Sequence, residues 1–402
     1  MRTSQRIVSG QLALVFSILT GTLTSFFLLL SVTSMHADAS GSGTSGAGLV
    51  TGALLFGTVI AEIGATRLMA KFGYRPVLAA GLVLLGAPTL LMLGSVPLSV
   101  IAVVSFVRGF GFGLSGVVTG ALVALLLPPE RRGEGIGLSG VVEAVPAIVA
   151  LPSGVWLAEH LGYQTVVIMA AVAALVPLAA FLRLRGVAKS SADAEAEEDA
   201  AARPAGLLAA LRGGDARRLT LVFAASAAGA GVVAAFLPLA HGIGASVASA
   251  GLLAQAVAAA VGGWLAGRYG DRHGHARLLT PGLVLSSLGL LAMFWLSAPV
   301  VVIAAMCVFG TGFGIVQNAV FAELINRMPS RMDTASALWS LAYDTGYGAG
   351  PALFGLFAAS TGYPVGFALT GALMLAAWPA ARRMLKAGPA QAGLAQAVAC
   401  QS

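Results

Sequence analysis

The sequence has few charged residues. Only 10% of its 402 residues are Asp, Glu, Lys or Arg, whereas a soluble domain carries about a quarter. Hydrophobic residues make up 58% of the chain. So few charged side chains cannot cover the surface of a chain this long in water. This composition excludes an ordinary soluble globular fold and predicts an integral membrane protein.

Residues that hold metals or cofactors are also scarce. Cys307 lies in an apolar run and Cys400 in the C-terminal tail, so neither disulfide nor metal-cluster spacing is present. No P-loop of the form G-x-x-x-x-G-K-[ST] occurs to drive transport with nucleotide. We therefore expect no cofactor, no metal and no enzymatic activity. All the histidines fall in predicted loops, at positions 36, 160, 241, 273 and 275.

Long apolar runs fill most of the chain. A bilayer core about 30 Å thick takes about 20 helical residues per crossing, so the length predicts twelve transmembrane helices and no strands. The first six spans are expected near 10–33, 47–69, 77–94, 98–126, 135–158 and 164–184. The second six are expected near 217–240, 246–269, 278–297, 299–323, 334–358 and 364–381.

The basic residues lie on one side of this topology. All but one of the 23 Lys and Arg fall in the termini, in alternate loops or at the adjoining helix ends, and the exception is Arg108 in the fourth span. Positive charge marks the cytoplasmic side, so both termini are predicted to be cytoplasmic. The net charge of +7 therefore indicates orientation in a plasma membrane and not nucleic-acid binding.

Composition predicts the domain boundaries. Residues 1–185 should form an N-terminal six-helix bundle and 217–386 a C-terminal one. The Ala-rich acidic stretch after Ser190 cannot bury a core, so residues 186–216 are expected to form a cytoplasmic linker. Within it, 205–212 is either a short surface helix or an extension of the seventh span. Residues 387–402 are expected to be a disordered tail.

An internal repeat relates the two halves. An ungapped offset of 201 residues places Gly111-Phe112-Gly113 on Gly312-Phe313-Gly314, and Glu143 on Asp344. The same offset holds across about 80 residues, which is difficult to obtain by chance. Each half has an even number of spans, so both enter the membrane in the same direction. We predict two six-helix bundles related by an axis along the membrane normal, with a cleft between them.

Local motifs then point to a family. The loop after the eighth span, from Gly267 to Arg277, resembles the G-x-x-x-D-R-x-G-x-x-R signature of the Major Facilitator Superfamily. Arg108, followed by glycines, is similar to the family's fourth-helix arginine motif. Gly346 to Pro351 is similar to its Gly-Pro antiporter motif, although here it lies in the eleventh span. The resemblance implies a twelve-helix secondary transporter that works by alternating access.

Charged residues inside spans are the first candidates for the mechanism, because each costs about 2.5 to 3.5 kcal/mol near the bilayer centre. Helix rise places Glu62 about 10 Å deep and Glu143 about 12 Å deep, with Arg108 and Asp344 near the midplane. The repeat would place Glu143 and Asp344 on opposite walls of one cleft. Opening the cleft to each side in turn would change their solvation and move a proton. The alternative is that Arg108 and an acid form a static buried pair.

Two further groups complete the candidate site. Gln317, Asn318, Trp339 and Tyr343 are expected to line the substrate path. Conformational latches are expected where the signature loops join helix ends, because charges there interact with helix dipoles; the alternative is that their basic residues only fix orientation. We expect Glu323 only to cap the inner end of the tenth span. The latch residues are Gly267, Asp271, Arg272, Gly274, Arg277, Lys71, Gly73 and Arg75.

These patterns predict a function. We expect a monomeric, proton-coupled antiporter in a bacterial inner membrane that exports a small hydrophobic or amphipathic compound, with the substrate, protons and lipid as its partners. One alternative is proton-linked uptake of a small polar nutrient, which would need more hydrogen-bonding side chains in the cleft. The other is a receptor on the same fold that transports nothing.

Overall fold

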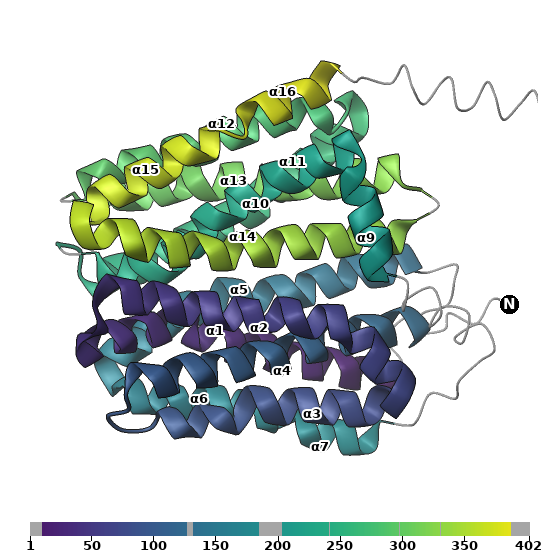
Figure 1. The fold of residues 1–402 in the computed structure, drawn as a ribbon, viewed down its shortest axis with the longest axis vertical. Coiled ribbons are helices and arrows are strands. Elements are labelled where there is room, and N and C mark those ends of the chain that lie inside the picture. The colour runs from purple at the N-terminus through teal and green to yellow at the C-terminus, as the bar shows by residue number, and fades with distance from the viewer. Residues whose placement is uncertain are drawn as a thin grey trace, which may run out of the picture. The chain divides into compact units, whose positions relative to one another are not determined.

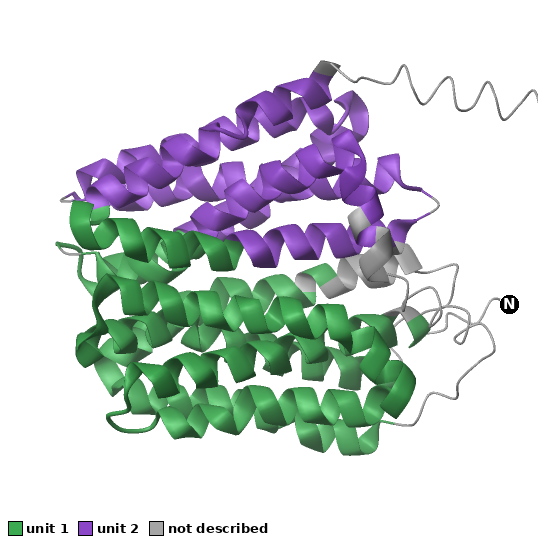
Figure 2. Cartoon of the chain, in the orientation of Figure 1, with its two compact units in different colours: residues 1–204, 231–253, 347–363 green, residues 205–230, 254–346, 364–402 purple. Residues whose placement is uncertain are grey.

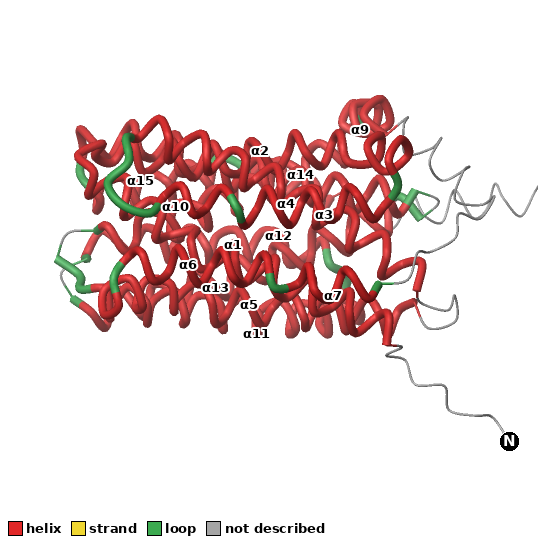
Figure 3. The backbone as a smooth tube through the Cα atoms, turned by 90° about the horizontal axis from the view of Figure 1, so that it is seen from below, coloured by secondary structure: helices red, strands yellow, loops and turns green. Residues whose placement is uncertain are grey.

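The computed structural model describes residues 10–126, 132–184, 203–240, 242–296, 298–329 and 331–386. Throughout these ranges the regular structure is helical, with no strand (Figures 1 and 3). This confirms the predicted all-α membrane fold. Most of the predicted linker, from 186 to 202, and the predicted tail at 387–402 lie outside the described residues.

The helices match the predicted spans closely. The first half contains α1 (Gly10–Ala37), α2 (Gly43–Phe72), α3 (Tyr74–Gly86), α4 (Leu98–Leu126), α5 (Arg132–Leu161), α6 (Tyr163–Leu175) and α7 (Pro177–Arg183). The second contains α10 (Gly214–Phe236), α11 (Ala245–His273), α12 (Ala276–Ala292), α13 (Pro299–Arg327), α14 (Met332–Thr361), α15 (Tyr363–Leu375) and α16 (Trp378–Lys386). Short helical turns extend α3, α10 and α12 as η2 (Pro88–Met92), η4 (Leu237–Leu239) and η5 (Met293–Trp295).

Two connections differ from the simplest expectation. A π-helical turn, η1 (Asp38–Ser42), joins α1 to α2, and its Gly41 has φ of 82°, a conformation that favours glycine. The open question about residues 205–212 is also answered, because α9 (Arg203–Arg212) is a helix of its own before α10. By length and composition, ten helical runs in the described residues can cross a membrane, and one of them, Gly10–Phe72, contains both α1 and α2.

The chain divides into two compact units (Figure 2). Unit 1 comprises Met1–Pro204, Gly231–Leu253 and Tyr347–Tyr363; unit 2 comprises Ala205–Ala230, Ala254–Gly346 and Pro364–Ser402. In unit 1, α4 packs against α2 and α3, and α1 packs against α5 and α6. In unit 2, α12 packs against α13 and α16. Unit 1 thus includes parts of α10, α11 and α14, and the predicted boundaries at 185 and 216 stay a prediction.

The distribution of side chains is that of a membrane protein. Leu182 is 74% exposed and Val300 is 79% exposed, whereas Ser25 and Ser226 are fully buried. Apolar side chains on the outer surface suit a hydrocarbon solvent, and small hydroxyl residues inside permit close helix packing. This pattern supports a multi-pass membrane protein.

Glycine contacts repeat between the two halves at the predicted offset. A Cβ at Gly109 would collide with the carbonyl of Leu54, and one at Gly310 with the carbonyl of Gln255, 201 residues later in both cases. Backbone therefore meets backbone where α2 crosses α4 and where α11 crosses α13. A Cβ at Gly111 would likewise meet the backbone of Leu85, and one at Gly312 the backbone of Ser286. A Cβ at Gly113 would meet the backbone of Thr58, and one at Gly314 the backbone of Ala259.

Candidate functional site

Arg108 is the most deeply buried charged residue among the described residues of unit 1. It lies on α4 with 1% of its surface exposed, and its Nη2 donates to the backbone carbonyl of Ser25 on α1 at 3.2 Å. Its Nε has no hydrogen-bond partner. Among the described residues no carboxylate pairs with it. The structure therefore gives no support to the static ion pair that we considered for Arg108.

The two candidate acids of unit 1 lie in different surroundings. Glu62 on α2 is half-buried and makes an interaction within the protein. Glu143 on α5 has an exposed side chain, although it lies well inside the length of its helix. Glu143 belongs to unit 1 and Asp344 to unit 2, so their predicted positions on opposite walls of one cleft stay a prediction.

Asp344 on α14 is the more deeply buried of two buried acids among the described residues of unit 2. Only 6% of its surface is exposed, and it makes an interaction within the protein. It follows directly after Tyr343, which belongs to a cluster of aromatic rings contributed by α10, α13 and α14. The ring centroids of Phe223 and Trp339 are 5.2 Å apart, and Tyr343 lies 6.0 Å from each. We call Phe223, Phe313, Trp339 and Tyr343 the aromatic cluster.

The other two predicted path residues, Gln317 and Asn318, are neighbours on α13. Trp339 Nε1 donates to the backbone carbonyl of Gln317 at 3.2 Å, which holds the indole against that helix. The Asn318 side chain packs over Gly267 of α11, and its Oδ1 has no hydrogen-bond partner. The structure thus brings Gln317 and Trp339 together and places Asn318 at a helix contact.

The residues of the predicted latches are mostly exposed. Gly73 and Gly274 occupy equivalent helix ends, with φ of 81° and 89°. Asp271 has a 77% exposed side chain and lies 3.6 Å from Nε2 of His275. Lys71 lies over the ring of Phe72, and Arg75 over the ring of Phe181. Arg272 and Arg277 are also exposed, so a latch role for these residues stays a prediction.

A different acid occupies the helix end in this region. Glu323 of α13 accepts a hydrogen bond from the backbone N–H of Ala276, the first residue of α12, at 3.0 Å. Its other oxygen accepts from Arg327 Nε at 3.0 Å. Glu323 therefore caps the N-terminus of α12, where a carboxylate is favourable, and also pairs with Arg327 on its own helix.

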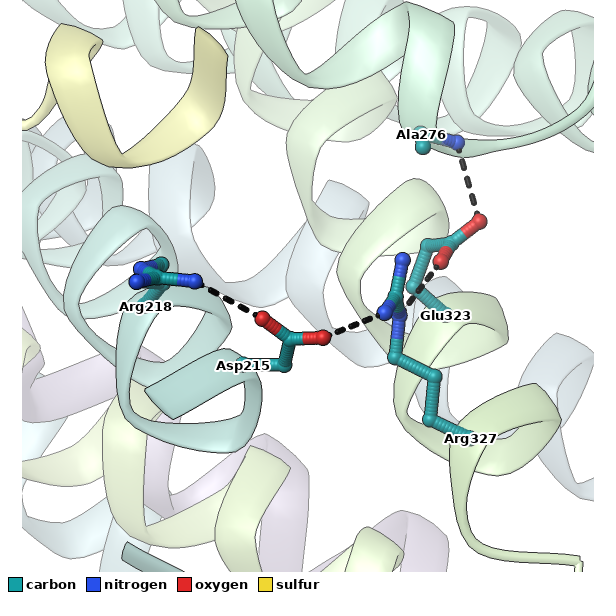
Figure 4. Close-up of polar contacts among 5 residues, drawn as sticks. All are labelled: Asp215, Arg218, Ala276, Glu323 and Arg327. Carbon is teal, nitrogen blue, oxygen red and sulfur yellow. Dashed lines mark hydrogen bonds and ion pairs between the residues drawn. The ribbon is translucent and has the colours of Figure 1, made fainter. Parts of the chain in front are cut away.

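Glu323 belongs to a chain of charges that links three helices (Figure 4). Arg327 also donates to Asp215 of α10 at 2.6 Å, and Asp215 accepts from Arg218 at 2.8 Å. We call Asp215, Arg218, Glu323 and Arg327 the charge chain. Its local pairs have the i,i+3 and i,i+4 spacing that a sequence reveals, but nothing in the sequence indicated that Asp215 and Arg327 meet.

The charge chain predicts a stability effect. Replacing Arg327 by Gln removes the cation shared by Asp215 and Glu323, and leaves two part-buried carboxylates close together. We expect a cost of about 1–2 kcal/mol, which lowers the thermal midpoint by about 3 °C. Arg383→Gln, which changes an exposed residue of α16, is the control. Equal midpoints in both variants, measured in detergent, would show that the chain contributes nothing.

Helices from both halves of the sequence meet within unit 1. Ser45 of α2 donates to the carbonyl of Gly355 on α14 at 3.2 Å, and a Cβ at Gly48 would collide with the carbonyl of Pro351. A Cβ at Gly348 would lie 2.6 Å from Cβ of Leu55. We call this the α2–α14 contact. At Gly48 and Gly348 it leaves no space for a side chain between the two helices.

Comparison with known proteins gives a consistent result. Residues 12–336 match the model of the Major Facilitator Superfamily, and no curated protein matches. The fold is similar to that of the xylose transporter XylE from E. coli in a partially occluded inward-open conformation, with a TM-score of 0.72, 16% identity and 95% and 98% of the two chains covered.

Two other solved transporters are equally similar. One is a bacterial homologue of the human lysosomal transporter Spinster, inward-facing and unoccupied, with a TM-score of 0.73, 14% identity and 94% and 97% coverage. The other is a POT family transporter in complex with 5-aminolevulinic acid, with a TM-score of 0.74, 12% identity and 94% and 96% coverage. At these identities the likeness concerns the fold.

Proposed function

Because the chain belongs to the Major Facilitator Superfamily, a family of secondary transporters, we propose that it is a proton-coupled antiporter that exports a small hydrophobic or amphipathic compound. It would act as a monomer in a bacterial inner membrane, with both termini in the cytoplasm. The observation that carries this proposal is Asp344, an acid 6% exposed in the middle of α14.

Asp344 supports the proton as the coupling ion. A carboxylate inside a membrane protein is costly unless it has a partner or reaches water. An acid in such a position gains or loses a proton when the access of water changes. Alternating access supplies that change, because the site faces each side in turn. Asp344 would bind a proton from one side and release it to the other.

The aromatic cluster supports the proposed class of substrate. The ring centroids of Phe223, Trp339 and Tyr343 lie within 6.0 Å of one another, and Tyr343 directly precedes Asp344 in the sequence. Aromatic rings offer large apolar faces, and Tyr and Trp add a polar group, which suits a hydrophobic or amphipathic compound better than a small polar nutrient. Proton-linked nutrient uptake is therefore the second candidate.

A flux assay tests the proposal. The purified protein is reconstituted in vesicles with a pH-sensitive dye inside, and hydrophobic and amphipathic compounds are screened for substrate-dependent pH change. Antiport predicts proton movement opposite to the compound, and uptake coupling predicts movement in the same direction. A receptor would move neither, so the absence of any flux across the screen would contradict the transport proposal.

Glu143 gives a variant test in the same assay. Glu143→Gln keeps the shape of the side chain but cannot ionise, so we expect coupled proton flux to fall at least about tenfold if Glu143 carries or relays the proton. Glu159→Gln is the matched control, because Glu159 lies on the same helix with a 47% exposed side chain near its end. Equal flux in both variants would remove Glu143 from the coupling.

A further inference from the structure

Four polar atoms without partners belong to Arg108 and to three residues near it in unit 1. They are Nε of Arg108, the hydroxyls of Ser25 and Ser105, and the hydroxyl of Tyr163. Arg108 and Ser105 are 1% exposed, and Ser25 is fully buried. Nearly all buried polar groups in proteins have a hydrogen-bond partner. Several without one in the same place indicate that something occupies the site in the working protein.

Helix geometry brings these groups together. Arg108 and Ser105 are three residues apart on α4, so their side chains are neighbours on one face. The guanidinium reaches the Ser25 carbonyl of α1. Tyr163, the first residue of α6, packs against the buried cluster that contains Val104 of α4, one helical turn from Arg108. The site therefore lies where α1, α4 and α6 meet, wholly within unit 1.

The two serine hydroxyls make no hydrogen bond to their own helix, unlike several other buried hydroxyls among the described residues. In a helix a Ser or Thr side chain commonly donates to the carbonyl four residues earlier. Ser115, Thr119 and Ser286 all do so, at 2.7 to 2.9 Å. Ser25 and Ser105 make no such bond, so their O–H groups are available to another acceptor.

The chemistry of the site selects the ligand. The guanidinium can only donate hydrogen bonds, and each of the three hydroxyls has a proton to give. No carboxylate of the described chain neutralises the buried charge, and α1 contains no Asp or Glu. A buried cation without a counter-charge is unfavourable. A planar carboxylate fits this set, because it accepts several hydrogen bonds and pairs well with arginine.

We propose that Arg108, with Ser25, Ser105 and Tyr163, binds a carboxylate, and that the transported compound is an amphipathic acid. This inference deepens the proposed function and rests on it for the identification of the ligand as the substrate. The binding site itself does not depend on flux, so binding and transport can fail separately.

A binding experiment tests the site. The parent protein in lipid nanodiscs is heated with increasing benzoate, with neutral benzamide of the same shape as the matched ligand. We expect a saturable rise in the thermal midpoint with benzoate only. The apparent Kd for benzoate should increase at least about tenfold in Arg108→Gln, because a charge-assisted hydrogen bond is lost.

Control variants separate binding from folding. Ser105→Ala should weaken benzoate binding about threefold, as the loss of one hydrogen bond predicts. Ser226→Ala should not, because it removes an equally buried and unpartnered hydroxyl in unit 2. If Arg108→Gln does not fold, Ser105→Ala and Tyr163→Phe decide the question. Equal affinity in the parent and in these variants would overturn the site.

The source of the anion is settled in the same experiment. A chloride titration without benzoate shows whether a free inorganic ion occupies the site. Stabilisation by chloride with no effect of benzoate would overturn the assignment of a carboxylate substrate. A response to neither ion would overturn the anion site. Benzoate binding without any benzoate-dependent pH change in vesicles would keep the site and contradict transport of this class of compound.

Discussion

Asp344→Asn is expected to reduce the rate of net proton-coupled transport about a hundredfold. A loss of this size is typical when a group that transfers protons is removed. Asn has almost the same shape as Asp and leaves no cavity, but it cannot ionise. Asp344 is 6% exposed, and a neutral side chain in a buried position avoids the cost of a buried charge. The variant should therefore fold. The measurement is substrate-driven acidification or alkalinisation of reconstituted vesicles.

The same variant separates coupling from substrate binding. Exchange of labelled for unlabelled compound across the membrane requires no net proton movement, so Asp344→Asn should retain it. A structural role would predict a parallel loss of exchange and of thermal stability. Glu159→Gln, which removes an exposed carboxylate, is the control for a charge change alone. Coupled transport at the parent rate in Asp344→Asn would exclude Asp344 as the proton carrier.

Substitution of Gly48 is expected to have the second large effect. A Cβ there meets the Pro351 carbonyl of α14, so the side chain of Gly48→Leu cannot fit while the α2–α14 contact is intact. Overpacking of this kind costs about 1–3 kcal/mol, which favours conformers in which the two helices have separated. We expect transport to fall about a hundredfold, because the cycle must return through the closed contact.

A label can report this separation directly. Ser45 lies in the contact, where it donates to Gly355. In a Ser45→Cys protein with Cys307 and Cys400 replaced by Ser, a membrane-impermeant maleimide should react slowly, and the addition of Gly48→Leu should speed the reaction about tenfold, in line with the population shift. Gly64→Leu on the same helix is the control, since a Cβ at Gly64 meets nothing within 4 Å. Parent-like transport and labelling in Gly48→Leu would contradict the closed contact as a required state.

The sequence was most informative where one local pattern determines the structure. Apolar length located every predicted span on a helix, because a segment in lipid must satisfy its backbone hydrogen bonds internally. The fourth span was predicted at 98–126 and α4 is Leu98–Leu126. The offset of 201 residues reappears in the glycine contacts, since Gly109 and Gly310 meet carbonyls that the same offset relates. Helix continuations were less predictable, and α1 runs to Ala37 because η1 continues it.

The candidate site was less accessible to sequence reasoning. The positions of Arg108 and Asp344 inside spans indicated buried charge, and both are buried. Their partners depend on how helices from distant parts of the chain meet. Arg108 binds a backbone carbonyl of α1, which no sequence motif marks. Glu323 caps α12, 47 residues away in sequence, although the sequence suggested only a cap on its own helix.

The glycine contacts have a practical consequence for measuring motion. Where α2 crosses α4, the carbonyl of Leu54 lies against Gly109, and the carbonyl of Thr58 lies against Gly113. Backbone lies directly against backbone at these points, and the Thr58 hydroxyl also donates to the Gly109 carbonyl at 3.1 Å, so the two helices should travel as one rigid body. Spin labels on the lipid-facing sides of α2 and α4 would therefore give an internal ruler of constant length, against which every other interhelical distance can be calibrated during turnover.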